Sequence, residues 1–196
     1  MAKADLYTLI IRRRTIRLFK QKAISSKILS AIANAARLAP SAANLQFLEY
    51  LAITKKEACK NVFGALRWAA YVQPKRNPPP SMRPRAYIII LINKERTKEP
   101  NVRDIGAAAE NILLSLLSFG LGGCWLQNID KQSLQTLLHL SPQYEIDSVI
   151  AAGYPAESPK LETSATAIKY WLDEKNRLHV PKRPLADVFH YHTIKV

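Results

Sequence analysis

Residues 104–127 read DIGAAAENILLSLLSFGLGGCWLQ, and this stretch decides how the chain is interpreted. Its first part is apolar on nearly every side and predicts a long helix that Asp104 caps and that continues through Phe119. Residues 105–126 are also long enough to span a bilayer. However, a glutamate and an asparagine lie near the middle of this stretch and glycines interrupt its end. We therefore expect a helix packed into a core and a subunit interface, with no membrane.

Helices and strands are expected to alternate irregularly around this helix. The predicted helices cover residues 3–13 (with Leu6 and Ile10 buried), 25–39, 55–66 and 130–138, and the tail after Pro181 starts as a helix. The predicted strands cover residues 49–53, 87–92 and 148–152, with another buried segment over 122–126. No GxGxxG or Walker motif joins a strand to a helix, which excludes a Rossmann or P-loop site. The sequence predicts an α+β fold with a mixed, mainly antiparallel central sheet flanked by helices, in a single domain over 1–196.

Composition and charge narrow the classes of protein. Lys and Arg number 29 against 15 Asp and Glu, which gives a net charge of +14 and favours polyanionic partners. The basic residues are scattered, without a zinc-finger or RRM-like motif, so charge alone does not predict nucleic-acid binding. Cys59 and Cys124 stand far apart, which argues against a disulfide scaffold or a zinc ribbon. The first residues lack a signal-peptide apolar region, and we expect a cytoplasmic protein.

Three segments are candidates for binding an anionic, planar ligand. Residues 12–17 hold four arginines, which exceeds what a helix C-terminus requires and favours phosphate binding. Residues 39–46, APSAANLQ, allow a close approach of backbone to a flat ring, although on its own the segment is better explained as a helix stop followed by an Asx-type turn. Residues 120–127 hold glycines that either end a helix or open backbone N–H groups towards a cofactor.

Taken together, these segments resemble the FMN-dependent nitroreductase family, in its compact bacterial form. RRTIRLF at 13–19 is similar to the family's RRSxRxF, and APSAANLQ at 39–46 is similar to its APSxxNxQ. The 104–125 helix with its glycine-rich exit, AGYP at 152–155 and KRPLADVFH at 182–190 follow in the family's order. The resemblance covers almost the whole chain. It implies a nitroreductase-like fold, an intertwined homodimer, FMN as cofactor and NAD(P)H as co-substrate.

The resemblance also implies roles for individual residues. Arg13, Arg14 and Thr15 match positions that hold the FMN ribityl chain and phosphate, and Arg17 matches the cation beside flavin N1 and O2. A cation there stabilises the reduced, anionic flavin. Three further groups of residues match family contacts. Pro40, Ser41, Ala42 and Asn44 match a loop that the partner subunit donates. Leu126, Gln127 and Asn128 match the segment that faces flavin N5, and Lys182 and Arg183 match the basic pair near the phosphate.

Departures from the family pattern leave the substrate open. Gln127 stands where many relatives have glycine, and Phe47 and Leu48 replace a proline and an aromatic residue. The proline-rich flap at 73–85 occupies the family's most variable region. We expect a small-molecule acceptor such as a nitroaromatic or a quinone. Two alternatives are other enzymes of the same fold, a reductive dehalogenase or a flavin-cleaving enzyme. Two more are a flavin-binding regulator without turnover and a nucleic-acid-binding module.

No residue of the chain itself is expected to act as a nucleophile or as a metal ligand. The four histidines have no convincing Ser or Cys partner, and His190 and His192 alternate in a way that predicts an edge strand rather than a metal site. This absence agrees with the resemblance, because in a flavoenzyme the cofactor carries the redox chemistry.

Overall fold

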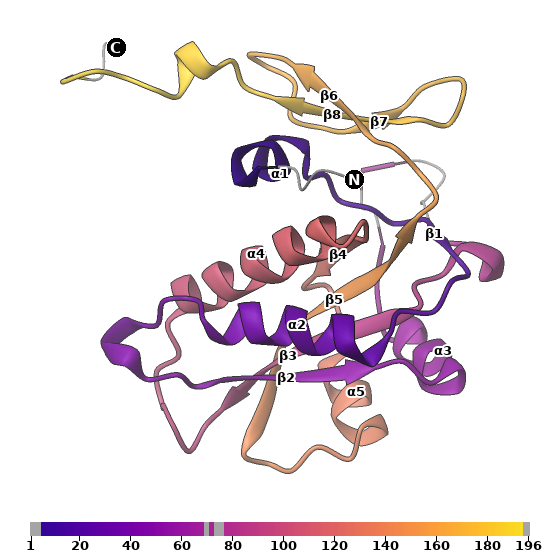
Figure 1. Cartoon of the computed structure of the whole chain (residues 1–196), viewed down its shortest axis with the longest axis vertical. Coiled ribbons are helices and arrows are strands. Elements are labelled where there is room, and N and C mark those ends of the chain that lie inside the picture. Colours follow the sequence, from indigo (N-terminus) through magenta and orange to yellow (C-terminus); the bar gives the residue numbers. More distant parts are fainter. Residues whose placement is uncertain (1–4, 69–70, 73–76, 194–196) are drawn as a thin grey trace.

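The computed structural model describes residues 5–68, 71–72 and 77–193, and its elements alternate irregularly along the chain (Figure 1). The helices are α1 (Leu6–Arg12), α2 (Ser26–Arg37), α3 (Lys56–Gly64), α4 (Val102–Ser118) and α5 (Lys131–Leu137), with short 3-10 turns η1 (Ala42–Asn44), η2 (Pro80–Met82) and η3 (Leu185–Asp187). The strands are β1 (Phe19–Lys20), β2 (Leu48–Ile53), β3 (Ala86–Asn93), β4 (Gly122–Leu126), β5 (Tyr144–Pro155), β6 (Lys160–Thr163), β7 (Trp171–Leu172) and β8 (Leu178–Lys182).

A five-stranded antiparallel sheet forms the centre of the fold, in the order β1-β5-β3-β2, with β4 also paired to β5. All eight residues of β3 are buried, as its isoleucine-rich sequence predicts for a central strand. Alternate residues of β3 point to opposite faces of the sheet. Ile88 and Ile90 belong to the core under α2 and α4, and Tyr87 and Ile89 belong to the core under α3 and α5. The predicted α+β class is confirmed.

The helix over residues 104–119 is confirmed, but its cap is not. The side chain of Asn101 accepts the backbone N–H of Arg103, so α4 begins at Val102 and Asp104 lies in its first turn. The helix ends at Ser118, and residues 122–126 form a separate strand. Among the described residues, no helix has both the length and the apolar character that crossing a bilayer requires.

Helix α1 does not bury the face that its periodicity predicts. Leu6 is 65 % exposed and Ile10 48 % exposed, and no residue of α1 is buried. Only residues 5–13 of the predicted 3–13 helix can be compared, because residues 1–4 lie outside the described part of the chain. The helical period is therefore present, but no other described part of the chain buries its predicted face.

The C-terminal part differs most from the prediction. Strands β6, β8 and β7 form a small separate sheet beside α1 (Figure 1), which the sequence reading missed. The predicted helix after Pro181 is limited to the single turn η3. The edge strand predicted around His190 and His192 is wrong, because residues 189–193 form no strand.

Candidate functional site

The arginine segment after α1 crosses the start of β4 in extended backbone. The Ile16 N–H donates to the Gly123 carbonyl at 3.0 Å. A Cβ on Gly122 would lie 2.5 Å from Ile16 Cγ1, so a side chain at this position would push the segment away. The glycine-rich exit of α4 thus allows the arginines to approach the end of the sheet.

A pocket of about 130 Å³ opens between this segment, the second half of α4 and the chain that follows β5. Arg12, Arg13 and Arg14 line one side of it, and Leu113 and Leu117 of α4 form an apolar wall. Cations beside an apolar wall suit a ligand with a phosphate at one end and a flat ring at the other.

The charges around the pocket are only partly neutralised within the chain. Arg13 Nε lies 3.0 Å from Glu110 Oε1, and both side chains are partly exposed. The Arg14 guanidinium donates to the Arg13 carbonyl and has no carboxylate partner within the residues that the structure describes. Burial, together with the charge of Arg13, lowers the pKa of Arg14. An anion in the pocket would offset both effects.

Arg17 is fixed through its backbone by a carboxylate that the sequence reading missed. The backbone N–H groups of Arg17 and Leu18 both donate to Glu157 Oε1. The Arg17 guanidinium lies 5.1 Å from the centre of the Tyr170 ring. Its Nε is buried, without a hydrogen-bond partner among the described residues. The glutamate in PAES, directly after AGYP, was the available sequence clue, whereas nothing local indicated Tyr170.

The loop at residues 40–44 is anchored at the other end of α4. Ser41 Oγ and the Ala42 N–H both donate to Asp104 Oδ2, at 2.8 and 2.9 Å. Ala43 and Asn44 have positive φ angles of 51° and 53° and form the exposed turn η1. A second pocket of about 110 Å³ lies between this loop, including Pro40, and the first half of α4.

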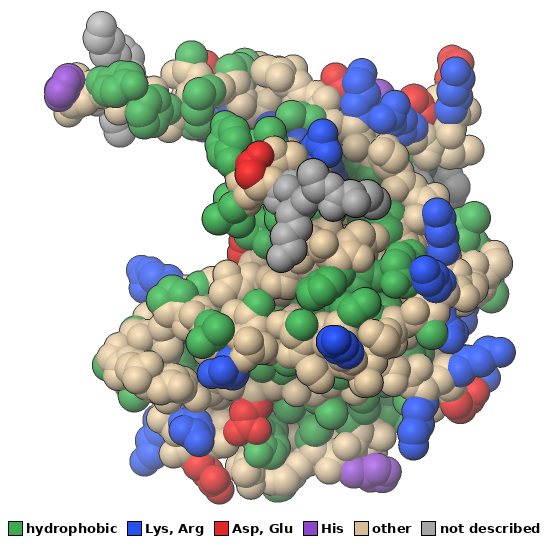
Figure 2. Space-filling model, viewed as in Figure 1, with side chains coloured by type: hydrophobic (Ala, Val, Ile, Leu, Met, Phe, Trp, Pro, Cys, Tyr) green, Lys and Arg blue, Asp and Glu red, His purple; other side chains and the backbone are tan. Residues whose placement is uncertain are grey.

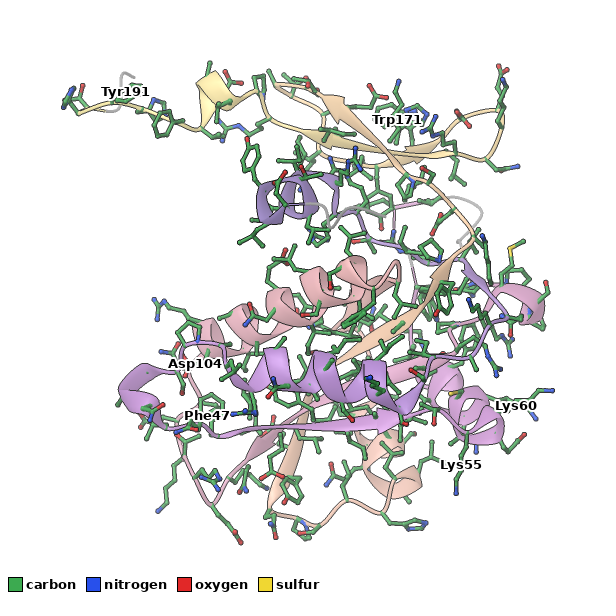
Figure 3. All side chains as sticks on the ribbon, viewed as in Figure 1. Phe47, Lys55, Lys60, Asp104, Trp171 and Tyr191 are labelled. Atoms are coloured by element: carbon green, nitrogen blue, oxygen red, sulfur yellow. The ribbon has the colours of Figure 1, made fainter. Side chains whose placement is uncertain are left out.

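Within one chain, the structure does not bring this loop to the arginines. The two pockets share no lining residue, and Figure 3 shows Asp104 and Phe47 at the end of the molecule that carries the loop. Asp104 and Glu110 are six residues apart, or about 9 Å along the helix axis.

The remaining predicted residues are more dispersed. Leu126 is buried at the far end of β4 from the arginine pocket, and Gln127 and Asn128 follow it on the surface. Lys182 ends β8 and is exposed. The Arg183 guanidinium donates to the Asp187 carbonyl at 2.7 Å. Thr15 is half-buried within the arginine segment.

Comparison with known proteins identifies the class to which this fold and site belong. The family model described as the nitroreductase family matches residues 10–154. The chain belongs to the nitroreductase family.

Individual relatives agree with this assignment. A protein of Archaeoglobus fulgidus, named as a candidate NADH dehydrogenase/NAD(P)H nitroreductase, is 30 % identical over 76 % of this chain and 84 % of its own length. A candidate nitroreductase of Desulfovibrio desulfuricans, solved in complex with FMN, superposes with a TM-score of 0.70 at 23 % identity, over 99 % of this chain and 100 % of that one. The NADPH:FMN oxidoreductase of Vibrio harveyi, complexed with NAD⁺, superposes with a TM-score of 0.70 at 18 % identity, over 97 % of this chain and 78 % of that one. The two structural likenesses establish the shared fold.

Proposed function

We propose that this protein is an FMN-dependent oxidoreductase that uses NAD(P)H to reduce small acceptors such as nitroaromatics or quinones. The observation that carries the proposal is the pocket in which Arg13 and Arg14 face the apolar wall of α4. The names of its relatives, which mention NAD(P)H and FMN, support the same chemistry.

The residues present fit FMN. Arg13, Arg14 and Thr15 would hold the phosphate and ribityl chain, since guanidinium groups bind phosphate bidentately. The unpartnered Nε of Arg17 is a donor available to a ring oxygen or nitrogen. When bound, FMN supplies a hydride acceptor for NAD(P)H and a hydride donor for the second substrate, which makes a ping-pong cycle the expected kinetic scheme. Arg17 would favour the reduced ring by placing a positive charge beside it.

The loop at residues 40–44 would complete the site from a partner subunit. Residues 126–128 would face flavin N5, and the pair Lys182 and Arg183 would lie near the phosphate. A dimer is supported by apolar surface that the single chain leaves uncovered. Tyr7 of α1 is 72 % exposed, and so is much of the C-terminal arm, residues 183–193, where Leu185 is 74 % and Tyr191 75 % exposed. Figure 2 shows hydrophobic side chains along this arm and a recess beneath it. Contiguous apolar surface of this kind marks an interface.

The test is the flavin content and activity of the purified protein. We expect yellow protein that releases FMN, together with parallel double-reciprocal lines for NAD(P)H and acceptor. The double variant Arg13→Ala, Arg14→Ala should lose FMN affinity at least 100-fold, on the order of two charge-assisted contacts. The matched double variant Arg96→Ala, Lys98→Ala removes two exposed cations elsewhere and should retain it. If the Arg13→Ala, Arg14→Ala protein purifies with full flavin, the assignment of these arginines to the phosphate is refuted.

The same measurements separate the alternatives. A regulator without turnover would bind FMN yet oxidise no NAD(P)H with any acceptor. A nucleic-acid-binding module would purify colourless and bind nucleic acid in a salt-sensitive way.

A further inference from the structure

A cavity of about 360 Å³ lies on the opposite side of the sheet from the arginine pocket, between α3 and the chain around η2. Its floor includes Cys59, which belongs to the core under α3 and α5, whereas Leu113 of the arginine pocket belongs to the core under α2 and α4. The two cavities share no lining residue. This cavity is therefore separate from the candidate flavin site.

Cations dominate the wall of this cavity. Lys56 and Lys60 come from the first turns of α3, and Arg83 and Arg85 come from the chain between η2 and β3. Among the described residues of the wall, Glu57 is the one with a carboxylate, and this carboxylate is already 3.3 Å from Lys60 Nζ. In Figure 2 Lys and Arg side chains gather on this side of the molecule, and Figure 3 shows Lys60 on α3 and Lys55 directly before it.

The backbones of the two arginines are held in place, but their Nε atoms have no hydrogen-bond partner among the described residues. The Arg83 guanidinium stacks on the Phe63 ring at 4.0 Å, and the Arg83 carbonyl accepts from Gln21 Nε2 at 2.9 Å. The Arg85 N–H donates to the Ala152 carbonyl at 3.1 Å, which fixes the backbone beside the cavity. The Nε atoms of both arginines are buried, and neither has a hydrogen-bond partner within the described part of the chain. Native structures seldom leave such donors unpaired, so both Nε atoms are available to a water, an ion or a ligand in the cavity.

We propose that this cavity binds the phosphate group of a small phosphorylated molecule. Two guanidinium groups match the geometry of phosphate oxygens, and Lys56 adds a third charge without a carboxylate partner in the residues described. The first turn of α3 has no side-chain cap, so its N–H groups add positive potential on the same side. Pro80 and Pro84 provide an apolar surface for the body of the ligand. The proposal is independent of flavin binding.

Isothermal titration of the purified full-length protein with inorganic phosphate and with pyrophosphate, at constant ionic strength, tests the proposal. We expect saturable binding that Arg85→Gln weakens at least tenfold. Lys98→Gln, which removes one exposed cation outside the cavity, should change the affinity less than twofold. Lys56→Gln, on the exposed first turn of α3, serves as a second variant should Arg85→Gln fold poorly.

A variant of the flavin pocket locates the binding. The Arg13→Ala, Arg14→Ala protein should retain the binding that depends on Arg85, even where any phosphate binding in the arginine pocket is lost. The proposal is overturned by an absence of saturable binding in the wild type, by equal effects of Arg85→Gln and Lys98→Gln, or by loss of all binding in the Arg13, Arg14 variant.

Discussion

Ser41 Oγ donates a hydrogen bond of 2.8 Å to Asp104 Oδ2, and the same oxygen accepts the Ala42 N–H. Ser41 Oγ in turn accepts the Gln46 N–H at 3.1 Å. One carboxylate, 6 % exposed, thus ties the start and the end of the 40–46 loop to the first turn of α4. The Asp104 side chain therefore holds this loop, and it does not cap α4 as the sequence predicted.

Replacement of Asp104 should therefore release the loop. We expect Asp104→Ala to lower the free energy of unfolding by about 1.5–3 kcal/mol, the range for hydrogen bonds to a charged group. Urea denaturation measures this. Ser41→Ala should cost less, since Ala42 keeps its bond to the carboxylate. If the loop completes a partner's flavin site, Asp104→Ala should also weaken FMN binding. An unchanged free energy of unfolding would contradict the first prediction, and an unchanged FMN affinity would contradict the second.

Glu110 should oppose the ligand that the arginines bind. Its carboxylate holds Arg13 at 3.0 Å and would repel a phosphate beside that arginine. We expect Glu110→Gln to bind FMN a few-fold more tightly, measured by fluorescence quenching of the flavin. Stability should change by less than about 1 kcal/mol, because exposed ion pairs contribute little.

Glu145→Gln is the matched control for this variant. It also removes a partly exposed ion pair, with Lys131 at 3.7 Å, but away from the arginine pocket. It should leave FMN affinity unchanged. Weaker binding in Glu110→Gln than in Glu145→Gln would mean that Glu110 positions Arg13 for the ligand instead of competing with it.

The C-terminal arm should hold the dimer together. Phe189 is 54 % exposed and Leu185 74 % exposed, so both side chains are free to contact a second copy. The double variant Leu185→Asp, Phe189→Asp should shift the protein from dimer to monomer in light scattering and lose flavin in parallel. Leu137→Asp, a charge introduced on α5, should leave the dimer intact. A dimer that survives the double variant would remove the arm from the interface.

Sequence reasoning succeeded where one side of an element is buried by its own chain. The isoleucine run of β3 and the apolar length of α4 each require burial, and the structure provides it. It failed at Asp104, because the apolar run begins at Ile105 and hides the polar first turn that Asn101 caps. Sequence reasoning also failed for α1. A helical period indicates that one face of the helix is apolar, but it does not say which molecule covers that face. Which residues meet at the candidate site depends on long-range contacts, such as Glu157 with Arg17, that no local pattern encodes.

The small C-terminal sheet was missed because its strands are short. Trp171 and Leu172 pair with Leu178 and His179 across a polar turn, in which Asn176 adopts a φ of 56°. The two-residue strand β7 is too short for any period to be recognised. Side-chain contacts, rather than strand length, hold this sheet together.

His179 is the centre of those contacts. Its Nδ1 lies 2.7 Å from Glu162 Oε1 and its Nε2 lies 3.1 Å from Asp173 Oδ2, while its ring stacks on Trp171 at 5.2 Å. The two ring nitrogens thus contact two carboxylates, one from β6 and one from the turn between β7 and β8, and His179 joins these two parts of the small sheet as a clamp.

Acid should open this clamp. Lys160 first and then His179 lower the pKa of Glu162 from its usual 4.5, and the backbone N–H of Arg177 first and then His179 lower the pKa of Asp173 from its usual 3.8. A carboxylate with a lowered folded-state pKa stabilises the fold fully above its usual pKa, and this stabilisation is lost as pH falls through the lowered value. The small sheet should therefore loosen below about pH 4, a window set by those usual values.

The fluorescence of Trp171 measures the opening of the small sheet directly. It is obtained across a pH series by subtracting the fluorescence of the Trp171→Phe variant from that of the wild type. His179→Gln, which cannot donate to both carboxylates, should show the open signal already at neutral pH. His190→Gln, in the exposed arm, should follow the wild type. A Trp171 signal that is the same in wild type and His179→Gln at pH 7 would show that the clamp does not hold the sheet closed.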